Sequence, residues 1–394
     1  MTSAVSNSAC PEKQFLAYCA HSQLDPSLKQ KIAELLERNL DWEYILDQAE
    51  ENSITPLVSR QLQAIATGGM PASAADRLKD ACRANTIRCL FLSAELIKIL
   101  DLFRSRGIQV IPYKGPVLAV QAYDDVTLRE FEDLDIILRQ SDLPKAHEVM
   151  LGLGYRPKYD WLLSAGAADS AVPGEYNYRD EERRIMVELH TELTLRHFPR
   201  TANLDEVSQR LVSVNLNDHE VRTFSVEDGL PILCIHGAKD FWERFSWIAD
   251  ISELVTRYPD LNWDITIRRA RALNAERMLH VGLALAAGLL DAPVSSEIRR
   301  RVQADPAATD VASEIANRLM SLNYRSLDAP GRFNFRRRML PGTFEGWRYA
   351  MRLSVVPAEE DWQMMRLPGP LAPLYIALRP LRLLRKYGWA SRRA

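Results

Sequence analysis

The chain has 394 residues, of which 47% are hydrophobic and 26% are charged, as in an ordinary globular protein. Its formal net charge of −2 gives no overall attraction to nucleic acid, so no nucleic-acid partner is expected. Five cysteines without a Cys-x-x-Cys pair argue against a disulfide framework and against a structural zinc site. The first residues show no signal-peptide pattern, and a cytoplasmic location is therefore predicted.

Residues 1–106 are predicted to form a helical N-terminal region. Asp25-Pro26 is a typical helix start, and apolar residues then recur at helical spacing. Gly107 follows the last of these segments and suits a helix C-terminal cap. The expected helices cover residues 28–40, 41–51, 56–66 and 73–106.

Residues 107–200 are predicted to form a small α/β domain. A β-type run begins at Ile108 and ends at Lys114-Gly115, and a charged turn joins two later strands. The expected order is strand, helix, strand, helix, strand, strand. These elements cover residues 108–114, 116–123, 132–138, 142–151, 176–178 and 184–189.

The remaining chain divides into a helical domain at 201–323 and an irregular, basic C-terminal extension at 324–394. The clearest helices are expected at 228–238, 242–258 and 270–290. The extension is expected to be irregular because residues 324–370 are rich in proline, glycine and arginine. The predicted fold class is α+β, with a small mixed sheet flanked by helical regions.

Two carboxylates, Asp133 and Asp135, begin the second predicted strand. Side chains alternate across a strand, so both point to one face while Leu134 points to the other. Oxygen ligands at this spacing suit Mg²⁺. With 52 acidic residues in the chain, about seven such pairs are expected by chance, so the motif alone is weak and a solvated strand end is the alternative.

The context of the pair adds weight. Lys114-Gly115 ends the preceding strand and opens a helix, and such a turn offers backbone N–H groups and a cation to a phosphate. A third carboxylate, Glu188, lies in a later strand. Phosphoryl chemistry with two metal ions uses such a carboxylate set. A plain turn and an edge-strand acid are the structural alternatives.

These motifs resemble the nucleotidyltransferase superfamily, and more closely the bacterial uncharacterised nucleotidyltransferase family. The resemblance covers most of residues 90–260 and the tail. It rests on a common order of short motifs. These are Lys114-Gly115, Arg129 with Asp133 and Asp135, Glu188 with His190, His236-Gly237 with Lys239, and then Trp242, Arg244, Trp247 and Asp250.

The resemblance implies a polymerase-beta-like catalytic fold and a metal-dependent nucleotidyltransferase. Mg²⁺ or Mn²⁺ would be held by three catalytic acids, Asp133, Asp135 and Glu188. An NTP and an unidentified acceptor are the implied partners, in natural-product or polysaccharide biosynthesis. The nucleotide-binding residues would be Lys114, Gly115, Arg129, His236 and Lys239. Pro116 follows the turn glycine and removes one N–H donor, which shifts weight to Lys114.

Structural roles remain open for several of these residues. Gly237 suits a close packing point between helices, and Lys239 a solvated position. His190 is expected to be structural, and Trp242 and Trp247 are expected in the core. Two other functions are kept: a degenerate nucleotide-binding or regulatory module, and a glycosyltransferase using Asp133-x-Asp135. The second is disfavoured because helices, not alternating strands and helices, precede the motif.

The tail from Pro373 to Tyr387 is a basic amphipathic helix with no acid nearby. Such a helix can pack on its own protein or lie on an anionic membrane surface. We expect docking on the helical domain, because an exposed leucine stripe reduces solubility. A membrane surface is the less favoured partner.

Overall fold

The structure is a computed structural model of the chain. It describes residues 10–23, 25–65, 70–158, 174–193, 204–322, 326–356 and 374–387, together with 361, 367 and 371.

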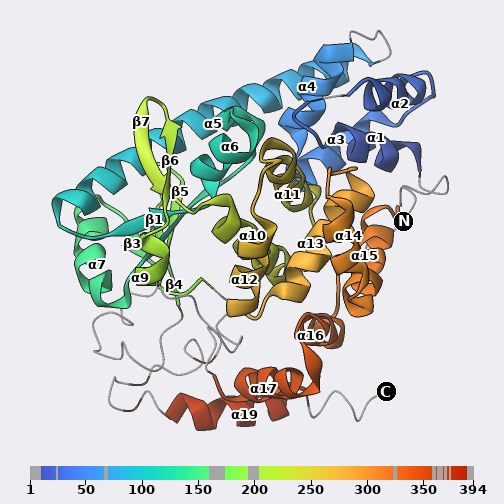
Figure 1. Ribbon diagram of the computed structural model, residues 1–394. Coiled ribbons are helices and arrows are strands. Elements are labelled where there is room, and N and C mark those ends of the chain that lie inside the picture. The colour runs from blue at the N-terminus through green and yellow to red at the C-terminus, as the bar shows by residue number, and fades with distance from the viewer. Residues whose placement is uncertain are drawn as a thin grey trace.

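The N-terminal region is helical, as predicted. Asp25 caps α2 by accepting a hydrogen bond from the Leu28 amide, and Asp41 caps α3 in the same way through Tyr44. The last helix is 34 residues long and passes along the sheet (Figure 1). The helices are α1 (Pro11–Cys19), α2 (Pro26–Leu36), α3 (Trp42–Glu51), α4 (Thr55–Ile65) and α5 (Ala72–Ser105).

A mixed five-stranded sheet follows, in the order β1-β2-β5-β4-β3. Only β2 and β5 are parallel; the other neighbouring pairs are antiparallel. The strands are β1 (Val110–Pro112), β2 (Asp133–Leu138), β3 (Arg156–Pro157), β4 (Glu175–Asp180) and β5 (Ile185–His190). The connecting helices are α6 (Gly115–Tyr123), η1 (Val126–Leu128), η2 (Gln140–Asp142) and α7 (Leu143–Gly152).

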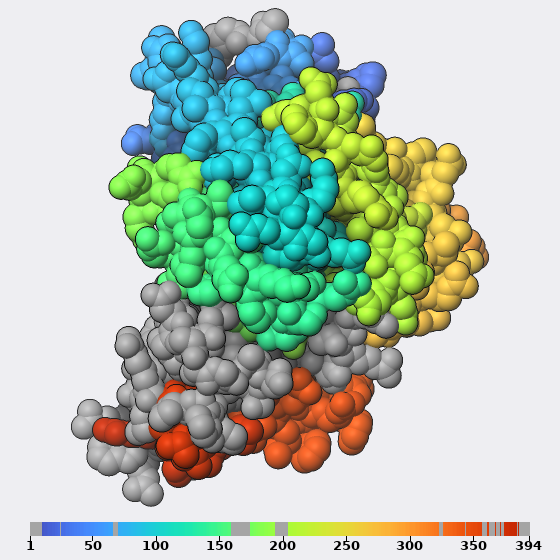
Figure 2. Space-filling model, turned by 90° about the vertical axis from the view of Figure 1, so that its left-hand side faces the viewer, coloured from blue at the N-terminus to red at the C-terminus, as the bar shows by residue number. Residues whose placement is uncertain are grey.

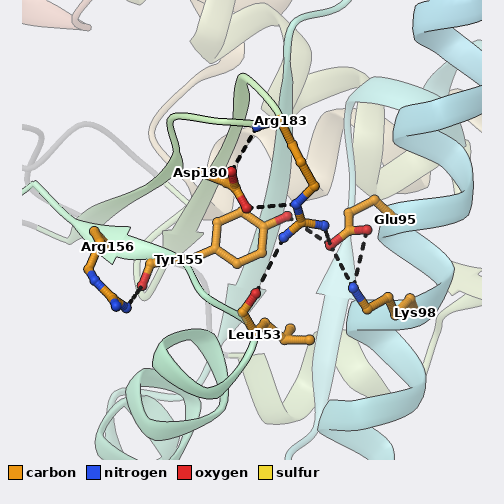
Figure 3. Close-up of polar contacts among 7 residues, drawn as sticks. All are labelled: Glu95, Lys98, Leu153, Tyr155, Arg156, Asp180 and Arg183. Atoms are coloured by element: carbon orange, nitrogen blue, oxygen red, sulfur yellow. Dashed lines mark hydrogen bonds and ion pairs between the residues drawn. The ribbon is translucent and has the colours of Figure 1, made fainter.

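A polar cluster fixes the β4–β5 turn against α5 (Figure 3). Arg183 lies at its centre and pairs with Glu95 at 2.8 Å and with Asp180 at 2.6 Å. The Tyr155 hydroxyl also donates to Glu95, at 3.0 Å. These contacts join the β4–β5 turn to α5 through Glu95.

A second, two-stranded sheet was not predicted. It consists of β6 (Val212–Leu216) and β7 (His219–Thr223), preceded by α9 (Leu204–Ser208). The signal was Asn217-Asp218, which both adopt positive φ and form a two-residue hairpin turn. The Thr223 hydroxyl donates to the Pro112 carbonyl at 2.7 Å, which holds the hairpin beside β1.

The second helical region gathers on one side of the sheet, whereas α7 lies on the other (Figure 1). The expected helix at 270–290 is two helices, because Asn274 adopts a φ of +57° and ends the first. The elements are α10 (Val226–Lys239), α11 (Phe245–Arg257), α12 (Trp263–Ala272), α13 (Glu276–Leu289), α14 (Ser296–Gln303) and α15 (Pro306–Leu319).

The prediction of an irregular C-terminal extension is wrong for much of its length. Helices α16 (Ala329–Arg338) and α17 (Gly342–Val355) form there, and α19 (Leu374–Tyr387) confirms the helix predicted at 373–387. Pro330 and Gly342 stand in the first turns of α16 and α17, where they do not interrupt helical hydrogen bonding. In the described part of the chain, no helix has the length and apolar character needed to cross a membrane.

Two hydrophobic cores lie on the two sides of the sheet. One packs α5 and α7 against one face and contains Leu134 and Ile136 of β2. The other contains Ile137 and joins the N-terminal helices to α10 through α15. The α+β fold with a small mixed sheet between helical regions is thus confirmed. The domain limits at 106, 200 and 323 stay predictions, and the second core crosses all three of them.

Candidate active site

The three predicted catalytic acids lie on one face of two neighbouring strands. Asp133 and Asp135 are two residues apart on β2, and Leu134 between them is fully buried on the opposite face. Parallel pairing sets Asp135 directly beside Glu188 of β5. Adjacent residues of paired strands point to the same face, so Glu188 stands next to the Asp133–Asp135 pair.

His190 joins these acids, although sequence reasoning favoured a structural role for it. Its Nε2 lies 3.0 Å from Asp135 Oδ1 and 3.5 Å from Glu188 Oε2. Asp135, Glu188 and His190 each offer a ligand atom, and these atoms lie within 4.8 Å of one another. The available signal was its spacing, since His190 follows Glu188 by two and therefore shares its strand face.

Lys114 and Gly115 bring the start of α6 to the acids. Lys114 is the N-cap residue of α6, and its Nζ lies 2.6 Å from Asp135 Oδ1. Gly115 adopts a φ of +51°, and a Cβ there would lie 3.2 Å from the Asp133 carbonyl oxygen. The close approach of two backbones and the left-handed conformation together explain the glycine.

The charges of this cluster are unequally compensated. Burial raises the pKa of the Asp133 carboxyl to about 6, and the charge of Asp135 adds to this shift. Burial acts on Asp135 in the same direction, but Lys114 and His190 outweigh it and hold the pKa of Asp135 below its usual range. The cluster therefore contains carboxylate charge that Lys114 and His190 do not fully neutralise.

A cavity of about 600 Å³ opens beside the acids. Six of the eight predicted site residues line it: Lys114, Gly115, Arg129, Asp133, Asp135 and His236. Further lining residues were not among the predicted site residues, and some come from distant parts of the chain that no local motif marks. Among them are Glu50 of α3 and Ser53 after it, Glu130 and Glu132 between Arg129 and Asp133, and Arg332 of α16.

Arg129 lines the cavity, but its guanidinium is already engaged. Nε and Nη2 lie 3.0 and 3.1 Å from the two carboxylate oxygens of Asp250 on α11. The Tyr123 hydroxyl donates to the same carboxylate at 2.9 Å. All three side chains are buried. These contacts join the segment before β2, which carries Arg129, to α11. A nucleotide contact by Arg129 stays a prediction.

The His236-Gly237-Ala238-Lys239 motif divides between cavity and core. The His236 ring lies edge-on to Trp247, with ring centroids 5.4 Å apart, and both line the cavity. Burial lowers the pKa of His236 well below its usual value, and the charge of Lys114 acts in the same direction. Lys239 instead pairs with Glu175 of β4 at 3.2 Å and does not line the cavity.

The core half of the motif is Gly237. A Cβ at this position would lie 2.7 Å from the indole of the buried Trp242. A Cβ at Gly282 of α13 would lie 3.0 Å from the same indole. The expectation that Gly237 is a packing point and Trp242 a core residue agrees with this geometry, whereas Trp247 is only half-buried.

The chain was compared with known proteins. Residues 38–291 match the model of a family described as uncharacterised nucleotidyltransferase. No curated protein matches the chain. Among solved structures, it is similar to the solution structure of the antibiotic-resistance factor ANT(2'')-Ia, with 12% identity and a TM-score of 0.33, over 46% of this chain and 90% of that one. The family match spans more than half of the chain.

Proposed function

The chain belongs to the uncharacterised nucleotidyltransferase family and is thus a nucleotidyltransferase. We propose that it transfers a nucleoside monophosphate from an NTP to a hydroxyl or similar acceptor, in a metal-dependent reaction. The observation that carries this proposal is the parallel β2–β5 pairing. It sets Asp135 beside Glu188, with Asp133 on the same face at the cavity.

The side chains fit a divalent cation. Asp133, Asp135 and Glu188 would hold Mg²⁺ or Mn²⁺, and His190 is a further candidate ligand that accords better with Mn²⁺ than with Mg²⁺. When bound, the cations would neutralise triphosphate charge and activate the acceptor oxygen. The incomplete charge compensation around Asp133 is consistent with a cation at this position.

The chain's own groups then have distinct tasks. The acceptor oxygen forms a bond to the α-phosphorus, the bond to the β-phosphate oxygen breaks, and pyrophosphate leaves. We assign to a Glu188 carboxylate oxygen the acceptance of the acceptor's proton. The Lys114 ammonium would move from Asp135 toward the triphosphate and offset its charge. The start of α6 would present backbone N–H groups to a phosphate.

Metal binding provides the first test of the proposal. Asp133→Asn and Asp135→Asn should each weaken Mn²⁺ binding in the presence of an NTP, measured by calorimetric titration. Asp101→Asn is the matched control, because that carboxylate lies exposed on α5. Unchanged titrations for both β2 variants would contradict the proposal.

The acceptor is the finer part of the proposal. We infer from the motifs shared with the family that the acceptor is a molecule of natural-product or polysaccharide biosynthesis. Incubating the protein with α-³²P-labelled NTPs and extracts of its source cells should label a product in the wild type but not in Asp135→Asn. NTP binding without any labelled product would support the alternative of a degenerate binding module.

A further inference from the structure

Exposed apolar side chains concentrate on the C-terminal helices. Within the described residues, 13 large hydrophobic side chains are exposed, and seven of them lie between 344 and 381. We name these seven the C-terminal patch. On α17 they are Phe344, Trp347 and Met351; on and before α19 they are Leu371, Leu374, Ile376 and Leu381. A soluble surface carries scattered apolar residues, so this clustering needs an explanation.

The patch is the outer side of a helix pair whose inner side is packed. Phe344, Trp347 and Met351 are spaced by three and four residues and share one face of α17. On the inner side, Tyr349 and Tyr375 are each 1% exposed. The tail helix thus packs on α17 through its inner face, whereas docking on the helical domain at 201–323 was predicted.

Ion pairs hold α19 in this position. The Arg379 guanidinium lies 2.7 Å from Asp361 and donates to the Leu353 carbonyl of α17 at 2.7 Å. Arg382 contacts the other oxygen of Asp361. This anchoring neutralises Asp361 and fixes the orientation in which Leu374 and Leu381, seven residues apart on α19, face outward with 49% and 64% exposure.

The C-terminal extension that carries the patch is basic in its sequence. From residue 329 to the end, the sequence has 13 arginine and lysine residues and only four acids. Arg337 of α16 and Arg385 of α19 are exposed, and the Arg348 guanidinium lies 5.9 Å from the centroid of the Phe344 ring. A second copy of the chain would bring the same positive charge to the contact, which opposes self-association through this surface.

We propose that the C-terminal patch docks on an anionic membrane surface. Aromatic and aliphatic side chains enter the headgroup boundary, and the surrounding arginines attract acidic phospholipid. No described helix can cross a bilayer, so the contact is peripheral. Both views place α17 and α19 at one end of the molecule, opposite the N-terminal helices (Figures 1 and 2). This inference does not rest on the proposed function.

Vesicle co-sedimentation of the full-length protein tests the proposal. The protein should pellet with phosphatidylcholine vesicles that contain phosphatidylglycerol, and about tenfold less with phosphatidylcholine alone or in high salt. The double variant Phe344→Ser with Trp347→Ser should lower binding about tenfold and keep its melting temperature, because the two side chains are 67% and 60% exposed.

The matched control is Ile87→Ser with Leu90→Ser, an exposed apolar pair on α5 with 61% and 46% exposure. It should bind vesicles like the wild type. Wild-type protein that stays in solution with anionic vesicles would overturn the proposal, as would equal loss of binding in both double variants. A dimer dissociated only by the α17 substitutions, in protein that ignores vesicles, would assign the patch to self-association instead.

Discussion

Two buried aspartates of this molecule have opposite electrostatic surroundings. Asp250 meets one guanidinium, from Arg129, and one hydroxyl, from Tyr123, so its charge is balanced and its oxygens are occupied. Asp135 also has cationic partners, Lys114 and His190, but two further carboxylates adjoin it. A balanced cluster holds elements together, whereas an unbalanced one retains the capacity to bind a cation.

The largest expected effect is on the unbalanced side. Glu188→Gln should reduce nucleotidyl transfer roughly 10³-fold, because residues of a catalytic set act as a unit. Its melting temperature should stay the same or rise, since one of the crowded carboxylate charges is removed. Product formation from labelled NTP and thermal melting measure the two quantities. A variant that unfolds, or that transfers at the wild-type rate, would remove Glu188 from the reaction.

Substitutions in the balanced Asp250 cluster should change the free energy of unfolding. Asp250→Asn leaves the Arg129 guanidinium buried without its partner charge and should cost about 3–5 kcal/mol of unfolding free energy. Urea denaturation measures this loss. Asp250→Leu combined with Arg129→Met removes both charges and should recover most of the stability. If the single variant loses less than about 1 kcal/mol, the Asp250 cluster is not the structural tie inferred from its geometry.

A smaller loss of stability is expected at Gly237, the packing residue of the His236–Lys239 motif. Gly237→Ala places a methyl group against the Trp242 indole and should cost about 1–3 kcal/mol through overpacking. Gly152→Ala is the control, because nothing lies within 4 Å of its added Cβ. If both variants unfold at the same urea concentration as wild type, the close contact at Gly237 has no energetic importance.

The smallest effect concerns a third carboxylate, the half-buried Glu130, which lines the cavity. Burial raises its pKa to about 7 from 4.5, against a hydrogen bond from the Thr55 amide. Glu50 acts in the same direction and Arg244 opposes it.

A raised folded-state pKa gives stability that is complete below pH 4.5 and is lost as the pH rises through 7. Glu130→Gln should therefore be more stable than wild type at pH 8, by on the order of 1 kcal/mol, with a flatter profile between pH 4.5 and 7. Denaturation at several pH values checks this, and parallel profiles would refute it.

The sequence was informative wherever a signal is local. Helix starts such as Asp25-Pro26, the strand containing Asp133 and Asp135, and the turn at Lys114-Gly115 were all placed correctly, because caps, alternation and glycine act over a few residues. The wrong predictions concern proline, glycine and turn residues, whose positions relative to helices and strands were misjudged. Proline and glycine in residues 324–370 suggested irregular chain, but Pro330 and Gly342 stand in the first turns of helices. The Asn217-Asp218 turn was overlooked, and with it the β6–β7 hairpin.

The sequence by itself determined the fold class and the residue types available for chemistry: three carboxylates, a lysine turn and a histidine at strand spacing. Only the tertiary structure decided their partners. Parallel pairing of β2 with β5 joined Asp135 to Glu188 and His190 across a separation of more than 50 residues. The packing of α11 brought Asp250 into an ion pair with Arg129. Such pairings depend on strand register and helix packing, which arise from the burial of whole faces and leave no mark in a short motif.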